Sequence, residues 1–169
     1  WEETNLSLSE TEKEEKIIEA ILVAGFFGMI LFDDVHPAGA DLGCQAEIGG
    51  GAAMSAAALV HLENGTLEQM VEAFTLVLKN SMGLICDPVA GLVEVPCVKR
   101  NGLYSSMAIS AATMALAGIK SFISADEVVL AVKEVGERMS EDYKETAHGG
   151  LAKTRDEKKV DQLVYETTQ

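Results

Sequence analysis

The three cysteines of the chain each stand beside residues that interrupt helices. Cys86 lies two residues before a proline, and Cys97 directly follows another. Cys44 directly follows a glycine and precedes an apolar run. Proline lacks a backbone donor and biases the residue before it away from helical angles, so these prolines do not suit the inside of a regular helix. We therefore expect all three thiols at helix ends or in connecting loops, where a sulfur can turn toward a ligand.

Cysteines in this setting are open to several kinds of chemistry. Free cysteine often behaves as a small buried apolar residue, and three in 169 residues is ordinary usage. A disulfide framework is disfavoured by the odd count and by the lack of a visible secretory segment. A zinc site would need a fourth ligand such as His36 or His148, and the wide spacing lacks the paired pattern of zinc sites. Three thiolates can instead hold a four-iron cluster and leave one iron without a protein ligand.

Three blocks of the sequence stand out together. They are Gly-Cys-Gln-Ala-Glu at 43–47, Gly-Leu-Ile-Cys-Asp-Pro-Val-Ala-Gly-Leu-Val-Glu-Val-Pro-Cys-Val-Lys-Arg-Asn at 83–101 and Tyr-Lys-Glu-Thr-Ala-His-Gly-Gly-Leu-Ala at 143–152. These blocks closely resemble the alpha chain of iron-sulfur-dependent L-serine dehydratases. The resemblance covers about residues 10–153, and the long middle block is its most specific part.

The resemblance implies a cofactor, a reaction and a partner. Cys44, Cys86 and Cys97 would hold an oxygen-sensitive [4Fe-4S] cluster. The reaction would be deamination of L-serine to pyruvate and ammonia without pyridoxal phosphate. The open iron would stabilise the departing hydroxide as a Lewis acid while a base removes the Cα proton. A beta domain or subunit is expected to complete the enzyme.

Two further motifs of the family, Thr-Gly-Gly-Asp-Ala and Pro-Thr-Ala-Gly-Ser-Cys-Gly, are absent from this sequence. The resemblance therefore indicates a fragment or an unusually short form of the alpha chain, with residues 1–169 forming a single helical domain. In that domain we expect the three sulfurs to converge on one side of the bundle, close enough to share a metal centre. The polar segment around Lys144 should lie nearby.

Several polar residues are candidates for catalysis and substrate binding. Lys144 and His148 are the candidate bases, and a residue of the partner chain is a further option. Asp87, Arg100 and Asn101 flank the cysteines and are candidate substrate-binding residues, together with Lys144, because they can orient a cluster or substrate through hydrogen bonds. The simpler interpretation of the flanking residues, helix capping and a surface ion pair, is equally open.

Other functions and partners follow from composition. Two alternative functions stay open. One is a cluster-dependent lyase that acts on L-cysteine or another amino acid, and the other is a non-catalytic helical domain with structural cysteines. A net charge of −14 argues against nucleic acid or an anionic membrane surface as a partner. The apolar runs at 17–32 and 102–119 are shorter or more polar than the roughly 20 residues of a membrane-spanning helix. We expect a cytoplasmic protein, with a homo-oligomer as one option.

The apolar pattern predicts an all-α fold, a compact bundle of about five or six helices with a cysteine-bearing loop between helices. Capping boxes at Ser9–Glu12, Thr66–Gln69 and Ser124–Glu127 mark three helix starts. The expected helices are about 10–31, 45–62, 66–82, 101–116 and 124–139. We expect the second half of the first helix to be buried on all sides. Residues 1–8 and 155–169 are expected to be flexible.

Overall fold

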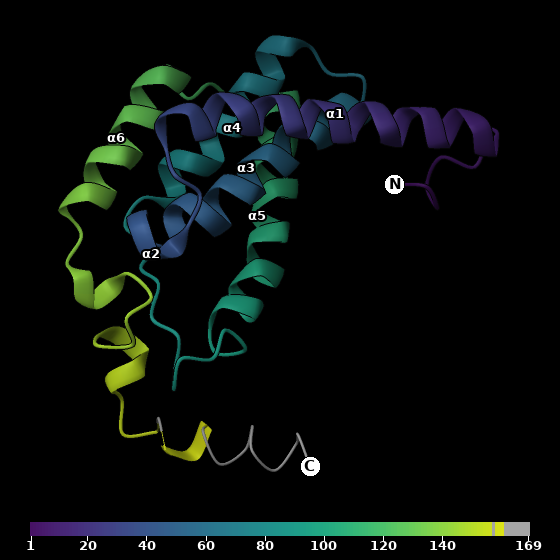
Figure 1. Cartoon of the computed structure of the whole chain (residues 1–169). Helices are drawn as coiled ribbons and strands as arrows, with labels where there is room; N and C mark the ends of the chain where they lie inside the picture. Colours follow the sequence, from purple (N-terminus) through teal and green to yellow (C-terminus); the bar gives the residue numbers. More distant parts are fainter. Residues whose placement is uncertain (157, 161–169) are drawn as a thin grey trace.

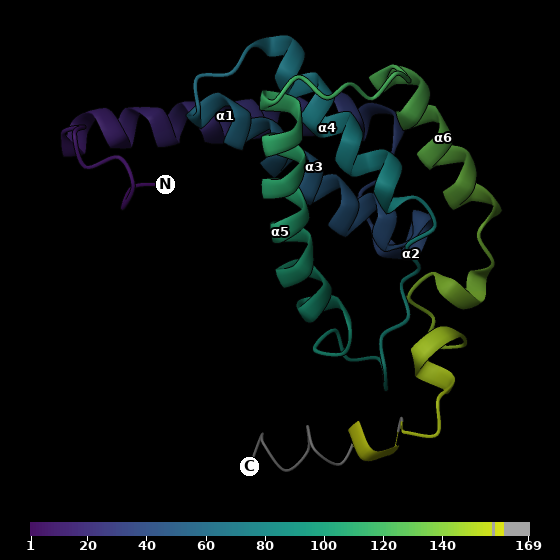
Figure 2. The same ribbon diagram turned by 180° about the vertical axis from the view of Figure 1, so that it is seen from behind.

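The computed structural model describes residues 1–156 and 158–160, which form a bundle of helices (Figures 1 and 2). The α-helices are α1 (Glu10–Asp34), α2 (Gly39–Leu42), α3 (Cys44–Leu62), α4 (Leu67–Ser81), α5 (Cys97–Leu116) and α6 (Ala125–Arg138). Two 3₁₀ segments follow, η1 (Glu141–Tyr143) and η2 (Gly150–Lys153). The described residues form no strand. The all-α prediction is confirmed, with five of these helices having 14 or more residues.

Helix α3 is the centre of the bundle and contacts α1, α2, α4, α5 and α6. Its small residues allow this, since a Cβ on Gly49 would lie 2.7 Å from the Cβ of Ser81 on α4. A Cβ on Gly50 would lie 3.0 Å from the Cδ2 of Leu31 on α1. Several alanines of α3 are also fully buried, namely Ala46, Ala53, Ala56 and Ala57. These small residues let α3 pack tightly against its neighbours.

The starts of three helices follow the predicted capping signals. Ser9 and Thr66 each form both hydrogen bonds of a capping box, at the starts of α1 and α4. At Ser124 the hydroxyl accepts a hydrogen bond from the Glu127 N–H, and the reciprocal bond of the box does not form. Helix α4 buries Met70, Phe74, Val77 and Leu78 in the core.

The prediction that the second half of α1 is buried on all sides is wrong. Three of its apolar side chains, Ile21, Leu22 and Met29, are 65%, 67% and 69% exposed. Helix α1 packs on α3 and α6, and its first turns project beyond the other helices (Figures 1 and 2). An apolar run identifies a helix, but it does not determine how many neighbours surround that helix.

Two boundaries near the cysteines also differ from the prediction. Helix α5 begins at Cys97 rather than at Asn101, with Pro96 in the N-cap position. A proline just before a helix is compatible with its start, because the first N–H groups of a helix have no partner inside the helix. Asn101 therefore lies within α5, where its Nδ2 donates to the Cys97 carbonyl at 3.2 Å. The connection between the predicted helices 10–31 and 45–62 contains the short helix α2.

The irregular segments lie together at one end of the bundle. The connection between α4 and α5 lies there, together with the start of α5 and the segments η1 and η2 (Figure 1).

None of the helices described is long and apolar enough to span a membrane. The expected flexibility of 155–169 falls largely on residues 157 and 161–169, outside the described ranges, and it stays a prediction, as does that of residues 1–8.

Candidate metal centre

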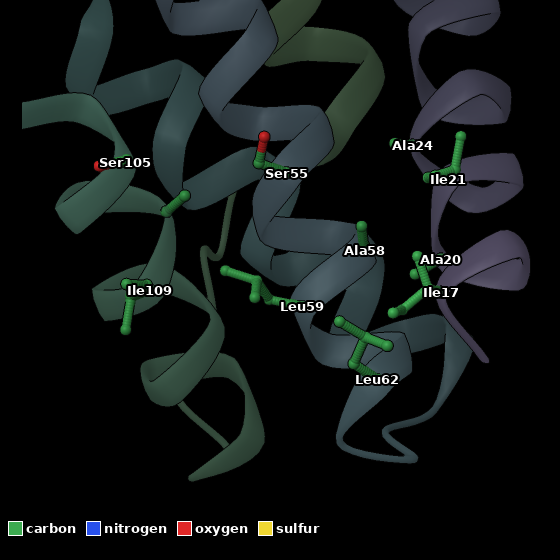
Figure 3. A pocket seen from close by; sticks show the side chains of 11 residues that line it. Ile17, Ala20, Ile21, Ala24, Ser55, Ala58, Leu59, Leu62, Ser105 and Ile109 are labelled. Carbon is green, nitrogen blue, oxygen red and sulfur yellow. The ribbon is translucent and has the colours of Figure 1, made fainter. Parts of the chain in front are cut away.

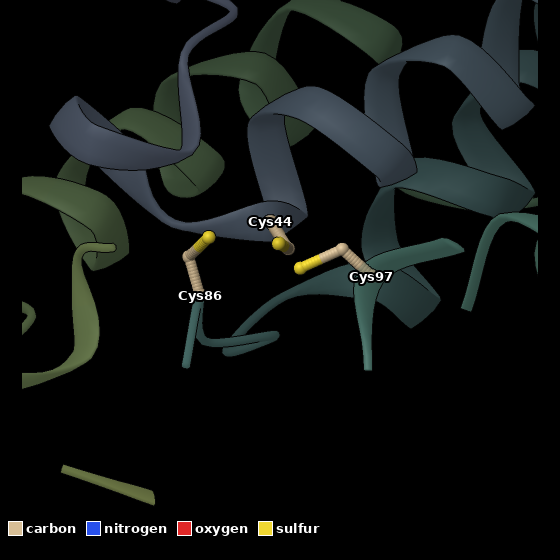
Figure 4. Close-up of side chains that lie close together, drawn as sticks. All are labelled: Cys44, Cys86 and Cys97. Carbon is tan, nitrogen blue, oxygen red and sulfur yellow. The ribbon is translucent and has the colours of Figure 1, made fainter. Parts of the chain in front are cut away.

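The three cysteines converge at this end of the bundle, as predicted. Cys44 is the first residue of α3, Cys97 is the first residue of α5, and Cys86 lies on the connection between α4 and α5. Their sulfur atoms all lie within 4.8 Å of one another, and Figure 4 shows the side chains pointing toward a common centre. The residues are free thiols with exposed fractions of 0%, 2% and 7% for Cys44, Cys86 and Cys97.

Gly43 places the thiol of Cys44. Its φ of 78° lies in the left-handed region that favours glycine. A Cβ at this position would also lie 2.8 Å from the Sδ of Met139 and 2.9 Å from the carbonyl oxygen of Leu84. The glycine is therefore required both by the backbone angle and by the closeness of two other segments.

Gln45, which sequence reasoning did not single out, fixes the start of α3 to its surroundings. Its side chain is fully buried. The Nε2 atom donates to the Val132 carbonyl on α6 at 2.9 Å, and the Oε1 atom accepts from the Gly83 N–H at 2.8 Å. Its own N–H donates to the Leu84 carbonyl at 3.0 Å. One amide side chain thus joins α3, α6 and the segment that leads to Cys86.

Backbone pairing places Cys86 beside the polar segment after α6. The Cys86 N–H donates to the Tyr143 carbonyl at 2.8 Å, and the Glu145 N–H donates to the Cys86 carbonyl at 2.9 Å. These bonds form an isolated parallel bridge between Cys86 and Lys144. The expectation that the segment around Lys144 lies near the cysteines is confirmed.

Asp87 is 1% exposed and joins two other segments. Its Oδ2 accepts a hydrogen bond from the Leu151 N–H in η2 at 2.7 Å. Its Oδ1 lies 2.8 Å from Nη1 of Arg100 in α5, an ion pair whose angles do not meet those of a hydrogen bond. The same Nη1 donates to the Ile85 carbonyl at 2.9 Å. The ion pair considered in the sequence therefore exists, and its carboxylate is buried while the Arg100 side chain is partly exposed.

The other predicted site residues differ in how they are held. The Lys144 side chain is 9% exposed, and its Nζ lies 3.0 Å from Oε1 of the exposed Glu141. His148 is exposed, and no contact found in the described residues joins its side chain to the cysteines. His36 instead pairs with Asp41 at the surface. Within the described residues, neither histidine joins the close group of metal-ligand atoms, which consists of the three cysteines.

The three thiols do not ionise independently. The hydrogen bond from Cys44 lowers the pKa of Cys86. The same bond, followed by burial, raises the pKa of Cys44. Burial and then the charge of Cys86 raise the pKa of Cys97 to about 11. Among the three sulfurs, called the cysteine cradle from here on, Cys86 is therefore the thiol that loses its proton most easily. A bound cation is the partner that would allow all three sulfurs to be thiolates, since metal binding displaces protons from its ligands.

Glu47 lies beside the cradle and was not among the predicted site residues. Its Oε2 accepts a hydrogen bond from the Gly39 N–H at 3.1 Å. A Cβ on Gly39 would lie 2.7 Å from this oxygen and 3.0 Å from the sulfur of Cys86, so the two atoms are near neighbours. The signal in the sequence was its position three residues after Cys44, because residues three apart share a helix face.

A groove of about 480 Å³ elsewhere in the molecule is a poor candidate for chemistry. It lies between α1, α3 and α5, and Figure 3 shows the side chains that line it. Its larger side chains are Ile17, Ile21, Leu59, Leu62 and Ile109. No cysteine and no charged residue lines it, so the cysteine cradle is the candidate functional site.

The fold and the cradle define an all-helical protein with a buried group of three thiols able to bind a metal. A family model described as serine dehydratase alpha chain matches residues 2–152, and the chain belongs to this family. The chain is 47% identical over 151 residues to a probable L-serine dehydratase, alpha chain, of Bacillus subtilis. It is 52% identical over 137 residues to one of Latilactobacillus sakei, and 42% identical over 140 residues to an L-serine dehydratase of Streptomyces coelicolor.

These matches cover most of this chain and a smaller share of the relatives. The shares of this chain are 89%, 81% and 82% for the Bacillus, Latilactobacillus and Streptomyces proteins. The corresponding shares of the relatives are 50%, 66% and 31%. The chain thus spans about half the length of the Bacillus relative and less than two thirds of the Streptomyces and Latilactobacillus proteins.

Proposed function

We propose that this chain is the metal-binding part of an L-serine dehydratase and that, together with a beta domain or subunit, it deaminates L-serine to pyruvate and ammonia. The observation that carries the proposal is the convergence of three buried cysteine sulfurs within 4.8 Å of one another. Membership of the serine dehydratase alpha chain family supports the reaction, and the names of the relatives support the substrate.

The donor set fits an iron-sulfur cluster better than zinc. Structural zinc sites take four protein ligands, and the close group in the described residues offers three thiols and no histidine. Cysteine thiolates are the usual ligands of four-iron clusters. Cys44, Cys86 and Cys97 would hold the [4Fe-4S] cluster. When bound, a cluster with one iron free of protein ligands supplies a Lewis acid for the hydroxyl group of serine.

The rest of the reaction is proton transfer and hydrolysis. A base takes the Cα proton, the Cα–H electron pair forms the double bond, and the β-hydroxyl leaves with its bonding pair. The resulting enamine tautomerises to an imine, and water converts it to pyruvate and ammonia. Lys144 is held beside Cys86, and an ammonium group is suited to binding the substrate carboxylate. The base is then His148 or a residue of the beta partner.

The cofactor is tested by anaerobic purification followed by iron and sulfide analysis. We expect a brown protein with about four iron and four sulfide per chain. Cys44→Ser, Cys86→Ser and Cys97→Ser should each lose most of this iron while keeping their helical circular dichroism. His36→Ala is the matched control, because His36 lies outside the cysteine group, and it should keep its iron. A colourless protein that contains zinc and no iron would overturn the assignment of an iron-sulfur cluster.

The reaction is tested with the loaded chain and an added beta partner. Pyruvate and ammonia should form from L-serine, and L-cysteine is offered in parallel to test the related lyase. Failure to deaminate L-serine with the cluster present would overturn the dehydratase assignment. Faster turnover of L-cysteine than of L-serine would overturn the choice of substrate and leave the cluster in place.

A further inference from the structure

An amino acid substrate brings a positive charge to the metal centre. At neutral pH L-serine carries an α-ammonium group, which has three donors and no lone pair. This group therefore cannot bind an electrophilic iron, and its hydrogen bonds need acceptors on the protein. An ammonium removed from water without an anionic partner is strongly disfavoured. A carboxylate at the rim of the cradle is the partner that this chemistry requires.

Two of the acids near the cysteines already have cationic partners. Asp87 is buried and is paired with Arg100, and it also accepts the Leu151 N–H. Glu141 is paired with Lys144 and is 80% exposed. These contacts leave Glu47 and Glu145. The Glu47 carboxylate and the Cys86 sulfur both face Gly39, where a Cβ would lie 2.7 Å from Oε2 of Glu47 and 3.0 Å from the sulfur. The Glu145 N–H donates to the Cys86 carbonyl at 2.9 Å, so both acids lie beside Cys86.

Glu47 is better held than Glu145. Glu47 lies on the long helix α3, one turn after Cys44, and its Oε2 is fixed by the Gly39 N–H at 3.1 Å. No other hydrogen bond or ion pair involves its carboxylate in the part of the chain that the structure describes, and the residue is exposed. Glu145 lies on an irregular turn with a φ of 64°, and no contact found among the described residues fixes its side chain.

We propose that Glu47 binds the α-ammonium group of the substrate amino acid, through the oxygen that Gly39 does not occupy. This proposal rests on the proposed function, and it explains how the enzyme would select amino acids as its substrates. The site would accept small amino acids with a free α-ammonium group and a leaving group on Cβ. Hydroxy acids and N-acylated amino acids of the same size would bind poorly, because they offer no cation to Glu47.

The test compares L-serine with L-glycerate, in which a hydroxyl replaces the ammonium group, on the cluster-loaded enzyme completed by its beta partner. Glu47→Gln removes the charge and keeps an oxygen that can accept from the Gly39 N–H. We expect this variant to raise the KM for L-serine about tenfold, the size of a lost charge-assisted hydrogen bond. Its inhibition constant for L-glycerate should stay within about twofold of the parent value.

A second readout follows ligand binding without turnover. L-Serine added to the reduced enzyme should change the electron paramagnetic resonance signal of the cluster, and Glu47→Gln should need about tenfold more L-serine for the same change. Iron content should equal that of the parent. Glu145→Gln is the matched control, and it should leave the L-serine and L-glycerate constants unchanged.

Three outcomes would overturn the proposal. Equal weakening of both ligands would show that Glu47 only supports the loop at Gly39. An unchanged KM for L-serine would show that Glu47 does not contact the substrate. A larger effect in Glu145→Gln would assign the ammonium group to Glu145. Failure of the proposed function can be distinguished from failure of this proposal. In that case the parent protein itself would contain no iron or would not turn over L-serine.

Discussion

The core of the bundle and its cysteine-bearing end are held together by different interactions. In the core, small and apolar faces of α3, α4 and α5 are buried against one another, and Ala53, Val60 and Val77 are fully buried. At the cysteine-bearing end, irregular segments are joined by backbone hydrogen bonds and by a few buried polar side chains such as Gln45 and Asp87. Helical packing supplies the frame, and polar contacts set the positions of the sulfurs.

This difference separates the stability of the fold from the geometry of the site. Loss of apolar burial removes free energy from the whole domain, because the core is one continuous cluster. Loss of a polar contact at the cysteine end releases one segment, since each such contact joins only two or three pieces of chain. Changes in the two regions should therefore give different combinations of stability and iron binding.

The largest loss of stability is expected from Phe74→Ala in the core. Phe74 is 1% exposed, and its ring centroid lies 5.0 Å from that of Phe27. Truncation of a buried phenylalanine leaves a cavity, and we expect the free energy of unfolding to fall by about 3–5 kcal/mol. Urea denaturation measures this change. The protein that stays folded should keep the iron proposed for the cysteines, and a variant that loses iron before it unfolds would contradict the separation of core and site.

A smaller loss of stability with a local effect is expected from Asp87→Asn. The amide can still accept from the Leu151 N–H but no longer balances Arg100. Breaking a fully buried pair costs roughly 3–5 kcal/mol, and we expect about 2–3 kcal/mol here because the Arg100 side chain is 18% exposed. Hydrogen exchange should quicken most at the amides of Leu151 and Cys86.

The surface pair between Glu134 and Arg138 provides the control for that variant. Its side chains are 58% and 79% exposed and lie 2.8 Å apart. Exposed pairs of this kind are worth at most about 1 kcal/mol, so Glu134→Gln should change stability and exchange very little. Uniformly faster exchange in Asp87→Asn, with no preference for the cysteine-bearing end, would show that Asp87 supports the whole fold rather than one segment.

Local signals made much of the fold predictable. The capping residues Ser9 and Thr66 and the spacing of apolar residues in α4 act within one or two turns, so the sequence contains all the information that they need. The placement of the cysteines at helix ends followed from the prolines and glycine beside them. Convergence of the sulfurs was an expectation that came with the metal interpretation, since spacing along the chain does not determine it.

The features that were missed depend on contacts between distant segments. Asp87 meets the Leu151 N–H across 64 positions, and Gln45 meets the Val132 carbonyl across 87. The exposed side of α1 has the same origin, because burial depends on the partners that a helix finds. Glu47 was hidden for a related reason, since its closeness to Cys86 arises from the fold of the segment at Gly39.

The smallest loss of stability is expected from changes at the starts of α4 and α6, which lie away from the cysteines. Thr66→Ala removes the hydroxyl of a complete capping box and should lower stability by about 1 kcal/mol. Each hydroxyl accepts one backbone hydrogen bond, at 3.3 Å for Thr66 and 3.4 Å for Ser124. Ser124→Ala should cost less, because the cap at Ser124 lacks the reciprocal bond that holds the Thr66 backbone in its capping geometry. Urea denaturation of both variants measures the difference, and iron content should match the parent in each. Equal losses would mean that the reciprocal bond from the Thr66 N–H to Gln69 does not strengthen the hydrogen bond to the Thr66 hydroxyl.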